Sequence, residues 1–432
     1  MDTILLVEDS SFFEKAVSRS FRRSDGFELI VGRTCAEASD ILDEHAAKIS
    51  VALVDLSLPD TTDVETVDLT THHKVPTIVF TSRFDPDLQT RLYGKGIVDY
   101  VLKDSPASLS YLRELVLRLR ANRGIGALML QHPDSPMKDV EEQLRRLQLS
   151  LVYASTAKEA INEITDNEYI RLLVVDSDIP DISTMELIKQ VRLRRGPEAV
   201  AIFALSKTLK RTDMVRLLKS GANEVLAKDC APEEFLLRTG QNLDTIDRIL
   251  KLTDAANNDA MTGLYNRRFL FEAGTHVFAE CRRSHQPIPV ALIDIDRFKQ
   301  VNDQYGHEVG DAVIKHLAND IASICDGNIL TVRLGGDEFC LLMPGSTLEA
   351  ARDRCGALVS RFHRHIHTAD GNPLDVTLSI GLSSGYEDKL SEALRVADER
   401  MYAAKSLGRD RIISEDYEMV EDQVVEHVLL DV

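Results

Sequence analysis

The feature that most constrains the fold is a series of short, fully apolar segments, each of which ends at a polar residue. The first such segment is residues 4–7, and similar ones lie at 51–54 and 77–80. Continuous apolar strands that alternate with stretches of helical periodicity indicate a parallel sheet with helices on both faces. Ligands of such sheets bind at the carboxyl ends of the strands. The polar residues at these ends, which we expect to form one site, are Glu8, Asp9, Asp55, Thr81 and Lys103.

The three acidic residues of this set, Glu8, Asp9 and Asp55, predict a magnesium site. Neighbouring carboxylates repel one another unless a hard divalent cation binds, and Mg²⁺ prefers carboxylate oxygens. Asp55 can then attack a phosphoryl group and form an acyl phosphate, whose oxygens Lys103 and Thr81 would stabilise. We therefore expect a phosphoacceptor site with one bound Mg²⁺ ion.

Residues 1–121 resemble the receiver domains of response regulators. The matching residues are Glu8, Asp9, the run from Asp55 to Pro59, Thr81, Tyr100 and Lys103. The resemblance implies that Asp55 accepts phosphate from an upstream sensor histidine kinase and that Tyr100 changes rotamer on activation. Two positions depart from the family pattern, because Asp63 stands where glycine is usual and Asp104 where proline is frequent.

A second copy of the same plan occupies residues 125–240. Asp176 ends an apolar strand there, as Asp55 does in the first copy. Ser206 and Lys228 are separated by the same number of residues as the threonine and lysine of the first copy. The first half of the chain therefore consists of two similar domains.

The second copy lacks two features of the first. Gln131-His132 stands in the place of the acidic pair, and Val225 stands in the place of Tyr100. Without the two acids the affinity for Mg²⁺ should fall sharply. We interpret this copy as a degenerate, receiver-like adaptor domain that is kept for packing and dimer contacts. The alternative is that Asp176 is a working phosphoacceptor.

Residues 232–257 are predicted to form a signalling helix. Pro232 followed by two glutamates is typical of a helix start. The apolar residues that fit a heptad pattern are Leu236, Leu243, Ile246 and Leu250. This pattern is compatible with a coiled coil that pairs two chains. It is equally compatible with an amphipathic helix that packs on its own domain.

The last third of the chain predicts a second acidic site. A buried strand at 289–293 ends in Asp294-Ile295-Asp296, and two further strands flank the run Gly335-Gly336-Asp337-Glu338. The glycine pair is typical of a hairpin turn that permits close backbone approach to a ligand. If Asp294 faces this hairpin, the carboxylates can hold two Mg²⁺ ions on a nucleoside triphosphate. Sites with two metals stabilise both the attacking and the leaving oxygen of an in-line displacement.

Residues 258–414 resemble the catalytic domain of diguanylate cyclases, which is named for the Gly-Gly-Asp-Glu-Phe motif found here at 335–339. Two further matching motifs are the run from Asp259 to Arg268 and the run from Lys405 to Arg409. The resemblance implies a palm-like fold and the synthesis of cyclic di-GMP and pyrophosphate from two GTP molecules. It also implies a homodimer, because each domain binds one GTP and two must face each other.

The resemblance assigns roles to individual residues. Asp294, Asp337 and the carbonyl of Ile295 would hold the two Mg²⁺ ions. Asp337 and Glu338 are the catalytic candidates, which would accept the proton of the 3′-hydroxyl. The residues that would contact the nucleotide are Phe298, Lys299, Asn302, His307, Asp311, Lys405 and Arg409. Among these, Asn302 and Asp311 would read the guanine edge, and the two lysines and the arginine would meet the phosphates.

One departure from the cyclase pattern concerns product inhibition. Many family members carry Arg-x-x-Asp shortly before the glycine pair, and the cyclic product binds there. The matching stretch here runs from Asp326 to Ile329 and has neither residue at its place. We expect feedback inhibition through that site to be absent.

The charge balance restricts the possible partners. The chain has 51 basic and 70 acidic residues, a formal net charge of −19, and part of this charge lies in the acidic tail at 415–432. A chain of this charge without a basic stripe is a poor candidate for nucleic-acid binding. The absence of a long apolar run, the lack of an export signal at the start and the six scattered cysteines favour a cytoplasmic protein away from the membrane.

The predicted architecture is α/β. Two doubly wound parallel-sheet receiver domains precede an α+β cyclase domain with a central, mostly antiparallel sheet. The predicted function is a diguanylate cyclase that phosphorylation of Asp55 controls. The alternative is a non-catalytic module that binds GTP or cyclic di-GMP and acts through contacts, although its usual sign, loss of the catalytic acids, is not seen here.

Overall fold

The chain forms two compact units, Met1–Leu250 and Lys251–Val432. The computed structural model describes residues 1–62, 64–131, 137–177, 179, 181–207, 210–325, 327–362, 374–414, 417–420 and 423–426. Three residues used in the sequence argument, Asp63, His132 and Asp326, lie outside these ranges. Among the helices of the described ranges, none combines the length and the apolar character needed to span a membrane.

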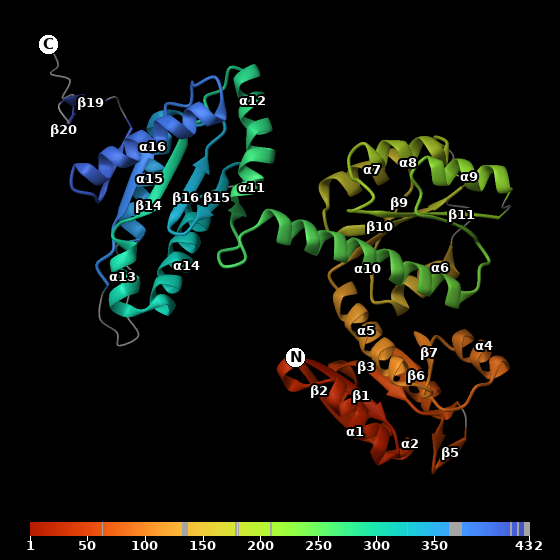
Figure 1. Ribbon diagram of the computed structural model, residues 1–432. Helices are drawn as coiled ribbons and strands as arrows, with labels where there is room; N and C mark the ends of the chain where they lie inside the picture. Colours follow the sequence, from red (N-terminus) through yellow and green to blue (C-terminus); the bar gives the residue numbers. More distant parts are fainter. Residues whose placement is uncertain are drawn as a thin grey trace. The chain divides into compact units, whose positions relative to one another are not determined.

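The first receiver domain has a five-stranded parallel sheet with the strand order β2-β1-β3-β6-β7 (Figure 1). Its strands are β1 (Asp2–Val7), β2 (Phe27–Gly32), β3 (Ile49–Val54), β6 (Thr77–Thr81) and β7 (Asp99–Leu102). Its helices are α1 (Ser11–Ser20), α2 (Cys35–His45), α3 (Glu65–His72), α4 (Pro86–Gly94) and α5 (Pro106–Asn122). In the parallel register Val7 lies opposite Val54. The residues that follow these two strands, Glu8 and Asp55, therefore emerge side by side.

The second receiver domain repeats this topology. Its strands are β8 (Gly126–Leu130), β9 (Ser150–Ala154), β10 (Ile170–Asp176), β11 (Ala201–Ser206) and β12 (Glu224–Ala227). The sheet order β12-β11-β10-β8-β9 is that of the first domain, given from the opposite edge. Its helices are α6 (Lys138–Arg146), α7 (Ala157–Asp166), α8 (Thr184–Arg192), α9 (Arg211–Lys219) and α10 (Pro232–Asn257). The expectation of two parallel-sheet domains is confirmed.

The two receiver domains share one hydrophobic cluster. Leu112 and Leu119 of α5 belong to the same cluster of buried residues as Phe203 of β11 and Leu243 of α10. Of the predicted heptad positions in α10, the first three are buried, whereas Leu250 is 36% exposed. The structure therefore favours the amphipathic alternative for the first half of this helix, which packs on the receivers of its own chain.

The second unit contains a mixed six-stranded sheet with the order β13-β15-β16-β14-β17-β18. Its strands are β13 (Tyr265–Asn266), β14 (Val290–Ile295), β15 (Leu330–Gly335), β16 (Glu338–Leu342), β17 (Leu378–Leu382) and β18 (Arg411–Ile413). The central pairs β14–β16, β14–β17 and β15–β16 are antiparallel, and the two outer pairs are parallel. A mostly antiparallel central sheet was predicted and is confirmed.

Helices cover both faces of this sheet. They are α12 (Thr275–Arg283), α13 (Phe298–Tyr305), α14 (His307–Ile324), α15 (Leu348–Phe362) and α16 (Leu390–Ser406). Phe339 and Leu341 of β16 belong to the cluster under α14 and α15, and Cys340 and Leu342 belong to the cluster under α12 and α16. This alternation is the two-residue period of a strand that is buried on both faces.

Gly381 of β17 sets how closely α16 approaches the sheet. A Cβ atom at this position would collide with the backbone of α16 at Ala397 and Met401. The hydrogen of glycine therefore permits a contact that no other residue allows. Lys405, near the end of α16, is positioned by this close packing.

The acidic tail contains a short hairpin. In it, β19 (Tyr417–Val420) pairs with β20 (Gln423–Glu426) in antiparallel orientation. Val420, Val424 and Val425 are β-branched residues, which are enriched in strands. The remaining residues of the 415–432 stretch lie outside the described ranges.

Candidate phosphoacceptor and catalytic sites

The carboxyl edge of the first sheet brings three carboxylates together. Oxygen atoms of Glu8, Asp9 and Asp55 all lie within 4.8 Å of one another. Asp55 and Glu8 are buried, with exposed fractions of 6% and 1%. Carboxylate oxygens at this mutual separation fit a hard divalent cation such as Mg²⁺. The three predicted ligands are thus assembled as the parallel register requires.

Lys103 neutralises part of this charge. Its Nζ lies 2.6 Å from Asp55 Oδ2 and 2.5 Å from Glu8 Oε2, and it also faces the ring of Phe13 at 4.6 Å from the centroid. Burial raises the pKa of Glu8, the lysine opposes this rise, and the charge of Asp55 adds to it. Three acids with a single lysine leave an excess of negative charge, which a cation would balance.

Thr81 is the last residue of β6, and Tyr100 lies in the neighbouring strand β7. Thr81 is fully buried. The Tyr100 hydroxyl donates a hydrogen bond to the carbonyl of Arg83 at 2.5 Å, and only 8% of the residue is exposed. The ring is therefore turned into the protein, against the loop that follows Thr81.

Asp99 connects this tyrosine with two others. One Asp99 oxygen accepts from the amide of Tyr100 at 2.7 Å and from the hydroxyl of Tyr93 at 2.6 Å. The other accepts from the hydroxyl of Tyr111 at 2.5 Å. Burial and the neighbouring carboxylate raise the pKa of Tyr93 and Tyr111, so both phenols keep their protons and donate. The sequence analysis did not identify this cluster, since tyrosines outside a motif carry no signal of it.

The second receiver has a different arrangement at the equivalent edge. Asp176 is completely buried and forms an ion pair with Lys228. The side-chain oxygen of Gln131 accepts a hydrogen bond from the amide of Met137 at 2.8 Å. In the described part of this domain, no group of three metal-binding side chains is found. The counterparts of Asp55 and Lys103 are therefore present and paired in the second receiver, but the acidic pair of the first receiver has no acidic counterpart at Gln131-His132.

In the second unit, Asp294 on β14 lies directly opposite Glu338 on β16. The turn before Glu338 uses positive φ angles at Gly335 and Gly336, of 142° and 55°. These left-handed conformations favour glycine. The predicted hairpin is confirmed, and it brings the strand end of Asp294 and the Asp337-Glu338 pair to one place.

Asp294 is the buried member of this acidic group. Lys405 Nζ lies 2.8 Å from Asp294 Oδ2. Burial raises the pKa of Asp294 to about 6, which Lys405 opposes and the charges of Asp337 and Glu338 reinforce. Asp337 is half-buried and Glu338 is exposed. The donor set fits Mg²⁺, although these three carboxylates do not reach the mutual 4.8 Å separation of the first receiver in this structure.

Asp296 has a structural role that the sequence did not reveal. Its carboxylate accepts from Thr377 Oγ1 and Ser379 Oγ, each at 2.6 Å, and from the amide of Asp410 at 3.1 Å. Arg409 approaches the same carboxylate at 4.0 Å. Asp296 thus holds β17 and the segment after α16 beside Asp294, and its oxygens are already occupied.

Arg333 is a second residue that the sequence analysis missed. Its guanidinium donates to the carbonyl of Gly336 at 2.8 Å and pairs with Asp259 at 2.8 Å. The start of the domain is therefore tied to the turn of the glycine hairpin. Asp259 had been noted as part of a motif, but its partner in β15 is apparent only from the fold.

The predicted nucleotide contacts lie on α13, α14 and α16 and just beyond α16. Asn302 of α13 packs over Gly310 of α14, because a Cβ at Gly310 would collide with Asn302 Oδ1. Asp311 therefore follows directly on the residue that Asn302 contacts. The exposed members of the predicted set are Lys299, His307 and Asp311, and the half-buried ones are Phe298, Asn302, Lys405 and Arg409.

The stretch before the hairpin offers no side chain for a product site. Ile329 is 8% exposed and belongs to the cluster under α14 and α15. Its side chain is directed into the core, so the position of the family's aspartate is filled by a buried apolar group. Asp326 lies outside the described residues.

Two family models match the chain. The model described as response regulator receiver domain matches residues 4–115 and 134–239. The model described as diguanylate cyclase, GGDEF domain, matches residues 256–411. Together they follow the three sheets in order.

Several curated proteins are similar to parts of the chain. The response regulator PleD of Caulobacter vibrioides is 28% identical over 265 residues, which is 56% of this chain and 56% of PleD. The chain thus spans little more than half the length of this relative. A diguanylate cyclase of Vibrio cholerae is 27% identical over 267 residues, covering 61% of this chain and 79% of that protein. The solved GGEEF domain of a diguanylate cyclase from Vibrio cholerae is 31% identical and covers 34% of this chain and 96% of that structure, with a TM-score of 0.33.

Proposed function

Since the chain belongs to the response regulators, with two receiver domains followed by a GGDEF diguanylate cyclase domain, we propose that it converts two GTP molecules into cyclic di-GMP under the control of Asp55 phosphorylation. The observation that carries this proposal is the pairing of Asp294 with Glu338 across the glycine hairpin. It places the buried carboxylate of Asp294 beside the half-buried Asp337 and the exposed Glu338 of the motif.

Asp294, Asp337 and the carbonyl of Ile295 would hold two Mg²⁺ ions, which neutralise a bound triphosphate and favour ionisation of the 3′-hydroxyl. Asp337 and Glu338 would accept the hydroxyl proton. Lys405, which pairs with Asp294, lies close enough to the metal-binding carboxylates to meet the phosphates of a bound nucleotide. In each of the two steps a bond forms between a 3′-oxygen and an α-phosphorus, and pyrophosphate leaves.

The remaining contacts orient the substrate. The carboxylate of Asp311 can accept from N1–H and N2–H of guanine together, and Asn302 beside it can complete the reading of that edge. Phe298 and His307 would border the nucleotide, and Lys299 and Arg409 would meet its phosphates. Because one domain holds one GTP, the reaction requires a homodimer in which two such sites face each other.

Control by phosphorylation would begin at the first receiver. A sensor histidine kinase would supply the phosphoryl group, one Mg²⁺ ion would bind at Glu8, Asp9 and Asp55, and Thr81 and Lys103 would hold the new oxygens. Movement of the loop after Thr81 would displace Tyr100, because the Tyr100 hydroxyl donates a hydrogen bond to the Arg83 carbonyl in that loop.

A chain of contacts leads from Tyr100 to α10. Tyr100 and Tyr111 share Asp99, and Tyr111 is on α5. Further along α5, the buried Arg118 donates to Asp244 at 3.0 Å and to Asp247 at 2.6 Å, both on α10. This helix continues to Asn257, where the cyclase domain begins. A shift of α5 would be passed to α10 through these charged contacts, since energetic coupling can be carried by contiguous networks of ion pairs and packed side chains.

The function is tested by incubating the chain with GTP and Mg²⁺, with and without an acyl-phosphate mimic, and identifying the product by mass spectrometry. Cyclic di-GMP should form, and Asp337→Ala or Glu338→Ala should remove nearly all turnover, since each loses a carboxylate of the reacting site. Asp353→Ala, an exposed acid on α15, is the matched control and should be as active as the unaltered chain. Near-normal activity in either folded hairpin variant would contradict the site.

We also propose that the cyclic product does not inhibit through the stretch before the hairpin. Arginine and aspartate at such a site supply charge-assisted hydrogen bonds of about 1.5–3 kcal/mol each. Ile329 is buried in the core and can supply none. Initial velocities should therefore be unchanged by micromolar cyclic di-GMP. Submicromolar noncompetitive inhibition, with product bound beside Ile329, would overturn this expectation.

A further inference from the structure

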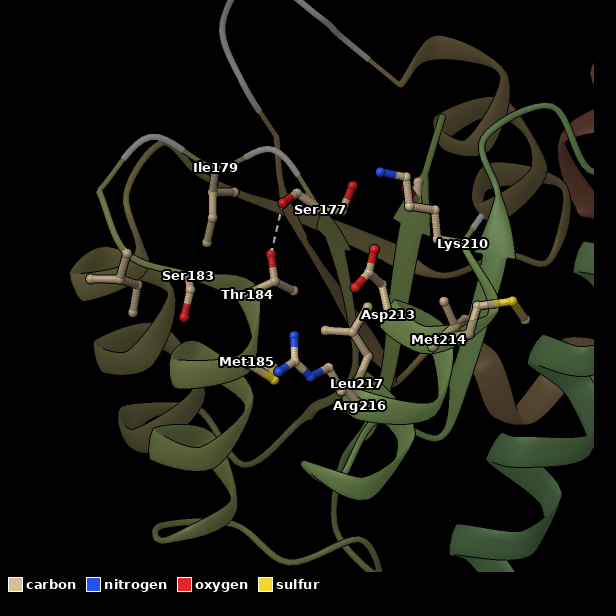
Figure 2. A pocket seen from close by; sticks show the side chains of 13 residues that line it. Ser177, Ile179, Ser183, Thr184, Met185, Lys210, Asp213, Met214, Arg216 and Leu217 are labelled. Carbon is tan, nitrogen blue, oxygen red and sulfur yellow. Dashed lines mark hydrogen bonds between the residues drawn. The ribbon is translucent and has the colours of Figure 1, made fainter. Parts of the chain in front are cut away.

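The second receiver contains a cavity of about 310 Å³ at the carboxyl edge of its sheet. It lies among the ends of β10, β11 and β12 and the helices α8 and α9 (Figure 2). Its apolar lining consists of Ile179, Ile182, Met185, Met214, Leu217 and Val225. The volume is at the lower end of the range of small-molecule sites, with room for one base and its ribose.

The cavity exists because two side chains of the first receiver have smaller or polar counterparts here. In the first receiver, Tyr100 of β7 and Leu88 of α4 are both buried. Their counterparts, by position relative to the strand-end Thr81 and Ser206, are Val225 and Asp213. Valine lacks the phenol ring, and the aspartate is exposed. The space that the switch tyrosine fills in one domain is thus left open in the other.

The rim of the cavity carries three charged side chains. In Figure 2 the carboxylate of Asp213 and the guanidinium of Arg216 point toward the space in front of Thr184, and Lys210 lies at its upper side in the view. The Thr184 hydroxyl donates to the carbonyl of Ser177 at 3.0 Å, and both residues line the cavity. Within the described ranges, none of the three charged groups has an ion-pair partner. Each is therefore available to a ligand.

From this lining we infer that the second receiver binds a guanine nucleotide. The base would lie against Met185 and Leu217. The Asp213 carboxylate would accept from N1–H and N2–H, and the Arg216 guanidinium would donate to O6 and N7. Lys210 would meet a phosphate. Adenine fits poorly, because its N1 is an acceptor and would face the carboxylate. The inference goes beyond the proposed function and does not depend on turnover.

The site is tested by binding to the full chain, with EDTA present to suppress binding at the magnesium-dependent site. Methyl-labelled methionine gives nine signals at most, and those of Met185 and Met214 are assigned through Met185→Leu and Met214→Leu. Titration with GMP should shift both signals saturably, whereas AMP should bind at least tenfold more weakly. GTP and cyclic di-GMP are then titrated separately, and the lower Kd identifies substrate or product as the source.

Variants locate the binding. Asp213→Asn and Arg216→Gln should each raise the Kd for GMP at least tenfold, because each removes a charge-assisted contact. Arg91→Gln, at the equivalent position of α4 in the first receiver, is the matched control and should leave the Kd unchanged. Val225→Tyr restores the ring of the first receiver and should abolish the shifts. If that variant does not fold, Asp213→Leu, which restores the other filling residue, should do the same.

Three results would overturn the inference. The first is that the signals of Met185 and Met214 stay unmoved at millimolar GMP. The second is that AMP shifts them as strongly as GMP does. The third is that binding persists in folded Val225→Tyr or Asp213→Leu.

Discussion

The two receiver domains have the same strand order and the same pairing of a strand-end aspartate with a lysine, yet they differ in charge balance. In the first, Lys103 faces the carboxylates of both Glu8 and Asp55, and Asp9 completes the group. In the second, Lys228 pairs with Asp176. Among the described residues, the first site has more carboxylates than cationic groups, whereas the aspartate and lysine of the second balance each other.

This difference suggests separate roles for the aspartate–lysine pair, which both domains have, and for the additional carboxylates, which the first domain has. In the second domain the buried Asp176 has its charge balanced by Lys228, and breaking such a pair would leave an uncompensated buried charge. The extra carboxylates of the first domain add nothing to such a pair except repulsion, which a divalent cation relieves. From this comparison we predict a structural role for Asp176–Lys228 and a chemical role for Glu8–Asp9–Asp55.

The largest expected effect is on phosphorylation. A small phosphodonor with Mg²⁺ should label the unaltered chain and Asp176→Asn alike, whereas Asp55→Asn should lose essentially all label. Of these two strand-end aspartates, Asp55 is the one that belongs to a group of three potential metal ligands among the described residues. Labelling is measured with radioactive donor or by mobility shift of the acyl phosphate. Strong labelling of Asp55→Asn would contradict the prediction that the first receiver, and not the second, accepts the phosphoryl group.

A smaller effect is expected on stability. Lys228→Met leaves Asp176 buried without its partner, which should lower the free energy of unfolding by about 3–5 kcal/mol. The double variant Asp176→Asn with Lys228→Met removes the stranded charge and should recover a large part of this loss. Urea unfolding of the three chains gives the comparison. An unchanged midpoint for Lys228→Met would show that the pair has no structural role.

The smallest effect concerns the transmission of the signal. Tyr100→Val gives the first receiver the residue that the second has at this position. Asp55 should be labelled normally, but stimulation of cyclase activity by phosphorylation should fall about fivefold or more, because coupling free energies of this kind are about 1–3 kcal/mol. Tyr100→Phe keeps the ring and loses only the bond to the Arg83 carbonyl, so it should retain more of the stimulation. Full stimulation of the valine variant would remove Tyr100 from the pathway.

How far the sequence could predict the sites depended on what each residue contacts. Glu8, Asp55 and Lys103 could be brought together from the sequence, because parallel pairing forces successive strand ends to one edge. The Asp294 strand and the glycine hairpin could be placed together on their motifs. Asp296 could not be separated from Asp294, since both carboxylates look alike until Thr377 and Ser379 are seen beside one of them.

Two other features could not be predicted from the sequence for a similar reason. The apolar stripe of α10 has a period that suits both a coiled coil and an amphipathic helix, and only the position of the receiver core decides how Leu243 and Ile246 are used. The link from Arg333 to Asp259 joins residues far apart in the chain. A charged residue in a strand that is not fully buried gives no sign of its partner.

The close packing of α16 on Gly381 has a consequence for how this protein can change during evolution. Any substitution there must displace the helix, because the obstacle is its backbone and no side chain can move aside. The displaced helix would carry Lys405 away from Asp294, so the damage would appear at the site of chemistry although Gly381 is not part of it. Surface positions of α16 such as Tyr402, which is 65% exposed, can accept substitutions, whereas Gly381 cannot. Selection for catalysis would therefore act on a residue that never touches the substrate.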